Sequence, residues 1–180
     1  MQVSIFGRTD KRPCIYTLIK MLQPLGDVAI VTANPMYKRL IEDWSDTGFC
    51  QNVAIFVTDA TADELWSTIE HSPDDFEYVI LDNLYNEETT VTLYVQGAGV
   101  EPLDEDLFEV FENIVTINMG TGKGKYVIPY TVDMLKNVEF VEFYRIPKAV
   151  SLKMATVLAD ILAGPAGIPA KELLKVVNKK

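Results

Sequence analysis

The sequence predicts a single α/β domain, a doubly wound three-layer fold with a mostly parallel central sheet of about seven strands. Two observations lead to this prediction. Short apolar runs alternate along the chain with segments in which apolar residues recur at helical spacing. The runs are apolar on both faces, which is typical of parallel strands covered by helices on each side. A chain of 180 residues, 48% of them hydrophobic, is long enough to bury one core.

The expected strands are short, continuous apolar runs. The run from Val28 to Val31, for example, is too uniformly apolar for a strand with one face in water. By the same reasoning we expect strands at 3–6, 28–31, 53–57, 78–82, 91–95, 114–118 and 126–130. The stretch 133–139 reads as helical or irregular, and 140–144 as another extended piece.

Capping residues mark the expected helices. Thr61 and Glu64, three residues apart, form a capping box. Helices are expected at 13–25, 34–48, 61–72, 101–113, 149–162 and 169–177. The helix at 34–48 would turn Trp44 inward, and the acidic helix at 101–113 would do the same with Phe108 and Val110.

One break in the chain is expected near its end. Gly164 closes the long helix at 149–162, and the glycine and proline that follow are typical of a hinge. The chain therefore divides into an α/β domain at 1–164 and a short helix with a tail at 165–180.

Composition narrows the classes of function. A formal net charge of -10 argues against binding of nucleic acid or anionic lipid by the surface as a whole. Two cysteines make a disulfide framework improbable and fit a reducing cytoplasm. No secretory signal and no apolar run of about 20 residues is visible, so we expect no membrane span. A single histidine excludes a multi-histidine metal site within one chain.

The polar residues that follow the expected strands are the candidate site residues, because ligands in such folds sit beyond the carboxyl ends of the strands. The loop 7–12 follows the first strand, Asp82 ends the fourth, Asn118 ends the sixth, and an Ile-Pro pair lies in the seventh at 128–129. In this order the features resemble the MinD/ParA family of deviant Walker-A ATPases. The resemblance implies an ATP and magnesium site, dimers that form face to face, and roles in partitioning or positioning of cell-surface machinery.

The first loop departs from the family pattern. Alignment places Gly7 on a family glycine and Lys11 on the main phosphate lysine, but Phe6 replaces the other lysine. Arg8 and Asp10 replace two further glycines. Because a loop that wraps phosphate needs glycine-like dihedrals, and because aspartate adds a negative charge, this loop predicts poor phosphate binding.

The position of the magnesium-binding hydroxyl holds Arg12, which has no acceptor for a cation. We therefore predict a degenerate relative without ATP hydrolysis and without a cofactor, acting as a protein-binding or assembly component. The vestigial nucleotide or anion site would comprise Gly7, Arg8, Lys11, Arg12, Asp82 and Asn118. Its three cations, Arg8, Lys11 and Arg12, would be the contacts to a protein partner or to a second copy in a homodimer.

Other interpretations remain open at this stage. The three cations could be a solvated loop, and Asp82 could bind only local backbone. The chain could be an active or nucleotide-sensing ATPase that uses ATP and magnesium with an atypical loop. It could also be an unrelated receiver-like or flavodoxin-like module, whose shorter sheet would leave the chain after Asn118 unexplained.

Overall fold

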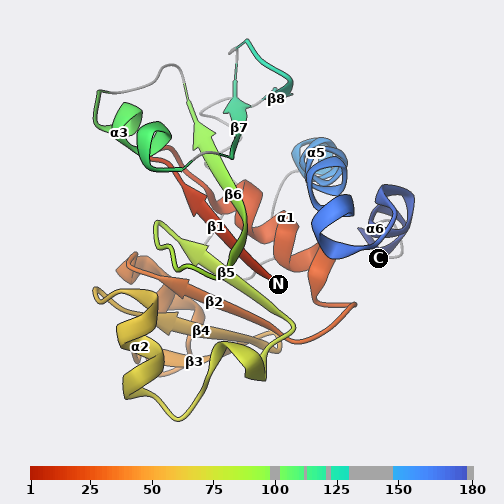
Figure 1. Ribbon diagram of the computed structural model, residues 1–180. Coiled ribbons are helices and arrows are strands. Elements are labelled where there is room, and N and C mark those ends of the chain that lie inside the picture. Colours follow the sequence, from red (N-terminus) through yellow and green to blue (C-terminus); the bar gives the residue numbers. More distant parts are fainter. Residues whose placement is uncertain (98–101, 112, 121–122, 130–147, 178–180) are drawn as a thin grey trace.

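The structure, a computed structural model, describes residues 1–97, 102–111, 113–120, 123–129 and 148–177. The pieces expected at 133–139 and 140–144 lie outside the described residues. Within them the chain forms one eight-stranded sheet (Figure 1). The strands are β1 Gln2–Phe6, β2 Val28–Thr32, β3 Thr47–Cys50, β4 Val53–Val57, β5 Tyr78–Asp82, β6 Thr89–Gln96, β7 Ile114–Met119 and β8 Tyr126–Ile128.

The sheet is mostly parallel, as predicted. Its strand order is β3-β4-β2-β5-β1-β6-β7-β8, and each pair is parallel except β3–β4. All seven expected strands are present, and β3 is the addition. Because β2, β5 and β1 are neighbours, their carboxyl ends meet at one point on the sheet edge, as expected for a doubly wound fold.

The extra strand corrects the prediction of a helix at 34–48. Only a 3₁₀ helix, η1 Pro35–Leu40, forms there. Trp44 is 61% exposed with φ 59°, so it does not face inward. The chain then enters β3, which returns as β4 through Gln51 and Asn52, at φ 51° and 63°. A two-residue turn with both residues in the left-handed conformation fits the twist of a β-hairpin. This explains why the end of the segment pairs with β4 as a strand and does not continue as a helix.

Helices cover the two faces of the sheet and make the three layers. Alternate residues of β2 enter different cores: Val28 and Ile30 pack with α1 Arg12–Leu22 and α5 Lys148–Ala166, while Ala29 and Val31 pack with α2 Ala62–Thr68. Figure 1 shows α1, α5 and α6 Ala170–Val177 together on one side and α2 on the other. The other helices within the described ranges are η2 Pro73–Asp75 and α3 Pro102–Val110.

Two details of the helices differ from prediction. Val110 is 69% exposed and so is not an inward residue of α3, whereas the ring of Phe108, 39% exposed, packs edge-on against buried Tyr94 with ring centroids 5.1 Å apart, as predicted. The helix α5 runs past Gly164 to Ala166, with Pro165 in its last turn. Gly167, at φ 64°, is the left-handed residue that ends it, and its N–H donates to the carbonyl of Gly164 at 3.1 Å. The capping box of Thr61 and Glu64 is confirmed at the start of α2.

The helix α5 has a composition that bears on membrane location. Among the described residues it is the one helix long and apolar enough to cross a membrane, by length and composition only. It packs on α1 and α6, and 44% of its most apolar window is buried inside the protein. Core helices of soluble proteins pass the same test, so the prediction of no membrane span stays a prediction.

Candidate functional site

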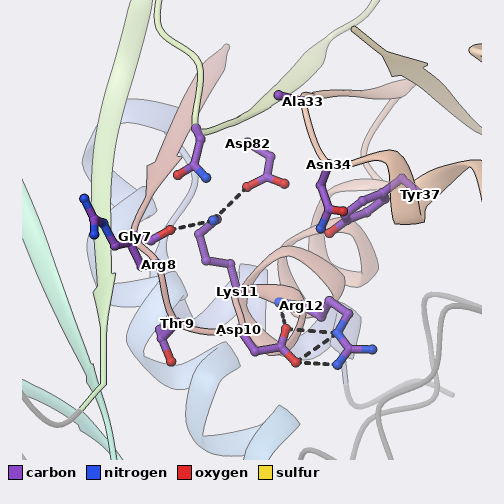
Figure 2. A pocket seen from close by; sticks show the side chains of 11 residues that line it. Gly7, Arg8, Thr9, Asp10, Lys11, Arg12, Ala33, Asn34, Tyr37 and Asp82 are labelled. Carbon is purple, nitrogen blue, oxygen red and sulfur yellow. Dashed lines mark hydrogen bonds and ion pairs between the residues drawn. The ribbon is translucent and has the colours of Figure 1, made fainter. Parts of the chain in front are cut away.

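A cavity of about 660 Å³ opens where β1, β2 and β5 end, at the place the fold class marks for a ligand (Figure 2). The loop after β1 and the start of α1 form one wall, and the loop between β2 and η1 forms another. It is lined by Gly7, Arg8, Thr9, Asp10, Lys11, Arg12, Ala33, Asn34, Tyr37, Asp82 and Asn83.

The Lys11 side chain crosses the cavity floor and is already engaged. Figure 2 shows its ammonium between the Gly7 carbonyl and the Asp82 carboxylate. Lys11 Nζ donates to Gly7 O at 2.7 Å and lies 3.2 Å from Asp82 Oδ1. The side chains of Lys11 and Asp82 are only 10% and 5% exposed. This ion pair is therefore largely shielded from water, and each charge depends on the other.

A hydrogen-bonded chain holds the other oxygen of Asp82. Thr32 Oγ1, at the end of β2, donates to Asp82 Oδ2 at 2.7 Å. The same hydroxyl accepts the backbone N–H of Asn34 at 3.0 Å. Asn34 in turn caps η1 by accepting from the N–H of Met36 at 3.0 Å. The end of β2 and η1 are thus tied to the carboxylate at the end of β5, which fixes its orientation.

A second charged pair lies at the start of α1. Asp10 accepts from Arg12 Nε at 2.9 Å and from the backbone N–H of Arg12 at 3.0 Å, while Arg12 Nη2 donates to Asp10 Oδ2 at 2.5 Å. Burial works against the charged guanidinium, but the hydrogen bonds and the charge of Asp10 outweigh it and raise the pKa of Arg12. Asp10 therefore occupies donors at the helix N-terminus that an external anion would use.

The glycine that begins the loop is required by its geometry. Gly7 has φ 134°, and a Cβ added there would lie 2.0 Å from the carbonyl oxygen of Val95 in β6. No side chain fits at that distance. The loop thus begins against β6, which explains the retained glycine without any reference to a ligand.

Two buried residues line or underlie the cavity. The ring of Tyr37 is 1% exposed, and burial together with the charge of Asp82 raises the pKa of its phenol well above the ordinary value. Cys14, fully buried on α1, is a packing residue of the core. The pKa of its thiol is raised to about 12, mainly by burial. The charge of Lys11 works against this rise and the charge of Asp82 adds to it.

The predicted site residues are only partly brought together. Gly7, Arg8, Lys11, Arg12 and Asp82 line one cavity. The sixth predicted residue lies at the end of β7 and lines a different cavity of about 640 Å³.

That sixth residue, Asn118, takes part in a local set of hydrogen bonds. It accepts a hydrogen bond from Gln96 and donates to the carbonyl of Lys123 at 3.2 Å. The distance between the two cavities follows from strand order, because β6 separates β7 from β1.

One lining residue, Tyr37, was missed by sequence reasoning. Asn34 was expected at this edge because it follows the buried strand β2, and the residues after neighbouring strands share one edge. Tyr37 lies three residues further along the chain, beyond the positions that directly follow the strand. No group of three or more His, Cys, Asp or Glu side chains suited to a metal ion occurs in the part of the chain that the structure describes.

Comparison with known proteins finds a match in fold. No protein-family model and no curated protein sequence matches the chain. Among solved structures, the MinD cell division protein of Aquifex aeolicus superimposes with a TM-score of 0.52 and 10% sequence identity. The superposition covers 99% of this chain and 95% of that protein. The chain therefore has a MinD-like fold, a single α/β domain built on an eight-stranded, mostly parallel mixed sheet.

Proposed function

We propose that this protein is a MinD-like binding or assembly component that does not hydrolyse ATP. The observation that carries the proposal is the state of Lys11, whose ammonium is bound within the chain by Gly7 and Asp82. A phosphate would have to displace a buried carboxylate from that ammonium, at a cost of several kcal/mol. The lysine that the family uses for phosphate is here part of the protein's own internal bonding.

The other residues of the loop fit magnesium triphosphate equally poorly. Asp10 places a carboxylate at the start of α1, where the family's phosphates would lie, and its partner is Arg12. Arg12 stands where the family has a hydroxyl ligand for magnesium, and a guanidinium cannot ligate a cation. These residues therefore support a protein without nucleotide chemistry, and no catalytic step is assigned to them.

Titration calorimetry with ATP and ADP, each with and without magnesium, tests the proposal. We expect no saturable binding up to about 1 mM nucleotide, which corresponds to a binding free energy weaker than about -4 kcal/mol. Magnesium-dependent ATP turnover that Lys11→Ala abolishes would overturn the proposal and favour an atypical ATPase. Circular dichroism of the variant shows whether it is folded, because loss of Lys11 also removes the partner of Asp82.

We further propose that Arg8 is the contact to an acidic partner surface or to a second copy. Of the three predicted cations, Arg8 is exposed at the mouth of the cavity, while the side chains of Lys11 and Arg12 are only 10% and 19% exposed. An exposed interfacial charge acts mainly through long-range attraction, which salt screens.

Sedimentation velocity at low and high salt tests the homodimer form of this proposal. We expect a dimer that weakens as salt rises and that Arg8→Glu weakens further. A dimer indifferent to both changes would count against it. A variant with the same charge change on α5, Lys153→Glu, is the matched control, because Lys153 is exposed away from this loop.

The process in which the protein takes part is also proposed by analogy. The similar structure belongs to a cell division protein. We propose a related task for this chain, in partitioning or in the positioning of cell-surface machinery, from a cytoplasmic location. Both cysteines are free thiols, which agrees with a reducing compartment.

A further inference from the structure

The strand β3 presents an open edge of the sheet. The N–H of Val57 donates to the carbonyl of Asp46 at 2.7 Å, which makes these residues a hydrogen-bonded pair. Because hydrogen-bonded and non-bonded pairs alternate in an antiparallel ladder, Thr47 and Phe49 are non-bonded residues. Their main-chain groups point away from β4. Ser45 Oγ donates to the Thr47 carbonyl at 2.6 Å, which leaves the N–H and carbonyl of Phe49 at the outer edge.

This four-residue edge has no charge, proline or bulge that would block pairing. Natural edge strands are commonly blocked by a charge, a proline or a bulge. The strand Thr47–Cys50 has the sequence TGFC, without charge or proline, and its four residues pair with β4 in continuous register. Among the described residues no strand lies beyond it. The Phe49 ring is 65% exposed, an unusual position for a large aromatic side chain.

A cavity adjoins the open edge. It has a volume of about 570 Å³, and its apolar lining comes from Val28, Phe49, Ala54 and Phe76. It lies at the starts of β2 and β4, the opposite end of the parallel strands from the cavity around Lys11. Phe49 and Ala54 are directly opposite each other in the hairpin, so their side chains share a face of the sheet. An added strand would place alternate side chains on that same face.

The charges around this cavity are acidic. Asp27 and Asp75 both line it, and no lysine or arginine is among the lining residues. His71 Nδ1 lies 3.4 Å from Asp75 Oδ2, and both side chains are about half exposed. Glu77 lies close by, where its carboxylate accepts the N–H of Asp27 at 2.7 Å. A ligand with positive charge next to an apolar group therefore matches this surface.

We propose that β3 is a docking edge for an extended segment of a partner protein, which adds a strand beside Phe49. In that segment an apolar side chain sits over the cavity and a lysine or arginine two residues away faces Asp27 and Asp75. The main chain supplies the pairing and the alternate side chains supply the selectivity. A second copy of this chain, paired through its own β3, is a poorer occupant, because TGFC offers no lysine or arginine to Asp27 and Asp75. The proposal does not depend on the nucleotide chemistry of the other cavity.

A synthetic peptide with the required pattern tests the proposal. The probe is acetyl-TVLTKVT-amide, in which the leucine and lysine lie two residues apart on one face. Titrated into ¹⁵N-labelled full-length protein, it should shift the amide signals of residues 47–50 most strongly, with a dissociation constant of about 1 mM or below. The control peptide TVLTEVT reverses the charge and should bind about fivefold more weakly. N-methylation of the leucine and lysine amides removes the pairing donors and should abolish binding.

Protein variants complete the test. Phe49→Lys and Phe49→Ser change an exposed ring, so both should fold, and both should weaken the peptide by about tenfold or more. The matched control is Leu152→Lys on α5, which adds the same charge at a side chain 39% exposed and should leave binding unchanged. Absence of binding, or shifts that ignore the Phe49 variants, would overturn the proposal. Concentration-dependent shifts at 47–50 without peptide would assign the edge to a second copy and overturn it as well.

Discussion

The two ends of the sheet hold cavities of similar size, whose polar groups differ in how far they are bonded within the chain. At the carboxyl end, around Lys11, the charged side chains pair with one another inside the chain. At the amino end, beside Phe49, main-chain groups of the strand edge face outward, and the carboxylates lie at an exposed surface where Asp75 pairs with His71. A fold can therefore keep a cavity at the usual ligand position while the polar groups of that cavity bond to one another. Polar groups available to a partner can then lie on a different surface. We therefore expect mutations in the two regions to have different effects on stability.

The largest expected effect is on the buried ion pair. Lys11→Met removes the charge that balances Asp82 and should lower the free energy of unfolding by about 3–5 kcal/mol. Asp82 Oδ1 has no hydrogen bond within the described part of the chain, so the ammonium is its main support. Urea denaturation followed by circular dichroism measures the change.

An exposed ion pair provides the control for that experiment. Lys38 pairs with Asp46 near β3, with side chains 33% and 69% exposed. Lys38→Met should change the stability by less than about 1 kcal/mol, because water screens such pairs. If both lysine variants behaved alike, the carboxyl end would not be closed by its own charges and the comparison would fail.

The second prediction concerns the glycine that begins the closed loop. Gly7→Ala should lower the free energy of unfolding by about 3 kcal/mol, because the new Cβ meets the Val95 carbonyl and because φ is positive. Gly164→Ala is the matched substitution, in α5 with nothing within 4 Å of the new Cβ. It should be neutral or stabilise by about 0.5–1 kcal/mol, since alanine favours helix over glycine. Thermal unfolding of the pair distinguishes strain from a general effect of the substitution.

The smallest expected effect is a pH dependence of the free energy of unfolding, caused by the buried thiol of Cys14. The Cys14 thiol has a pKa of about 12 in the folded protein and about 8.5 when unfolded. Between these values the unfolded chain releases a proton that the folded chain keeps, so stability is full below pH 8.5 and falls as pH rises. From pH 8.5 to 9.5 the loss should be about 1 kcal/mol.

Replacement of each cysteine isolates that contribution. Cys14→Ala should remove the extra slope, measured by urea denaturation with a reductant present. Cys50→Ala should keep it, because Cys50 is only partly buried. Equal slopes in the two variants would show that the thiol beneath the cavity does not ionise on unfolding as expected.

The sequence was most informative where pattern and local chemistry agree. The continuous apolar runs predicted seven strands, and the Thr61–Glu64 capping box predicted the start of α2, because both signals are local. The strand β3 was missed because TGFC is short and contains glycine, so its pairing depends on the left-handed turn at Gln51 and Asn52.

The site was predictable in its position and less so in its bonding. Parallel strands imply a shared carboxyl edge, which correctly grouped the first loop with Asp82. Strand order is not encoded locally, so the separation of Asn118 could not be foreseen. The contact of Lys11 with Asp82 likewise depends on β1 lying beside β5, a long-range fact that loop residues do not reveal.

The bond from Lys11 to the carbonyl of Gly7 four residues earlier closes the first loop on itself. Any incoming anion competes with partners that are permanently at hand, so its measured affinity includes the work of opening this ring. If opening requires about 3 kcal/mol, an anion of millimolar apparent affinity would bind the opened loop about 150-fold more tightly. The loop's own hydrogen-bond partners thus compete with any anion for Lys11, and because this competition is within one chain, dilution does not weaken it.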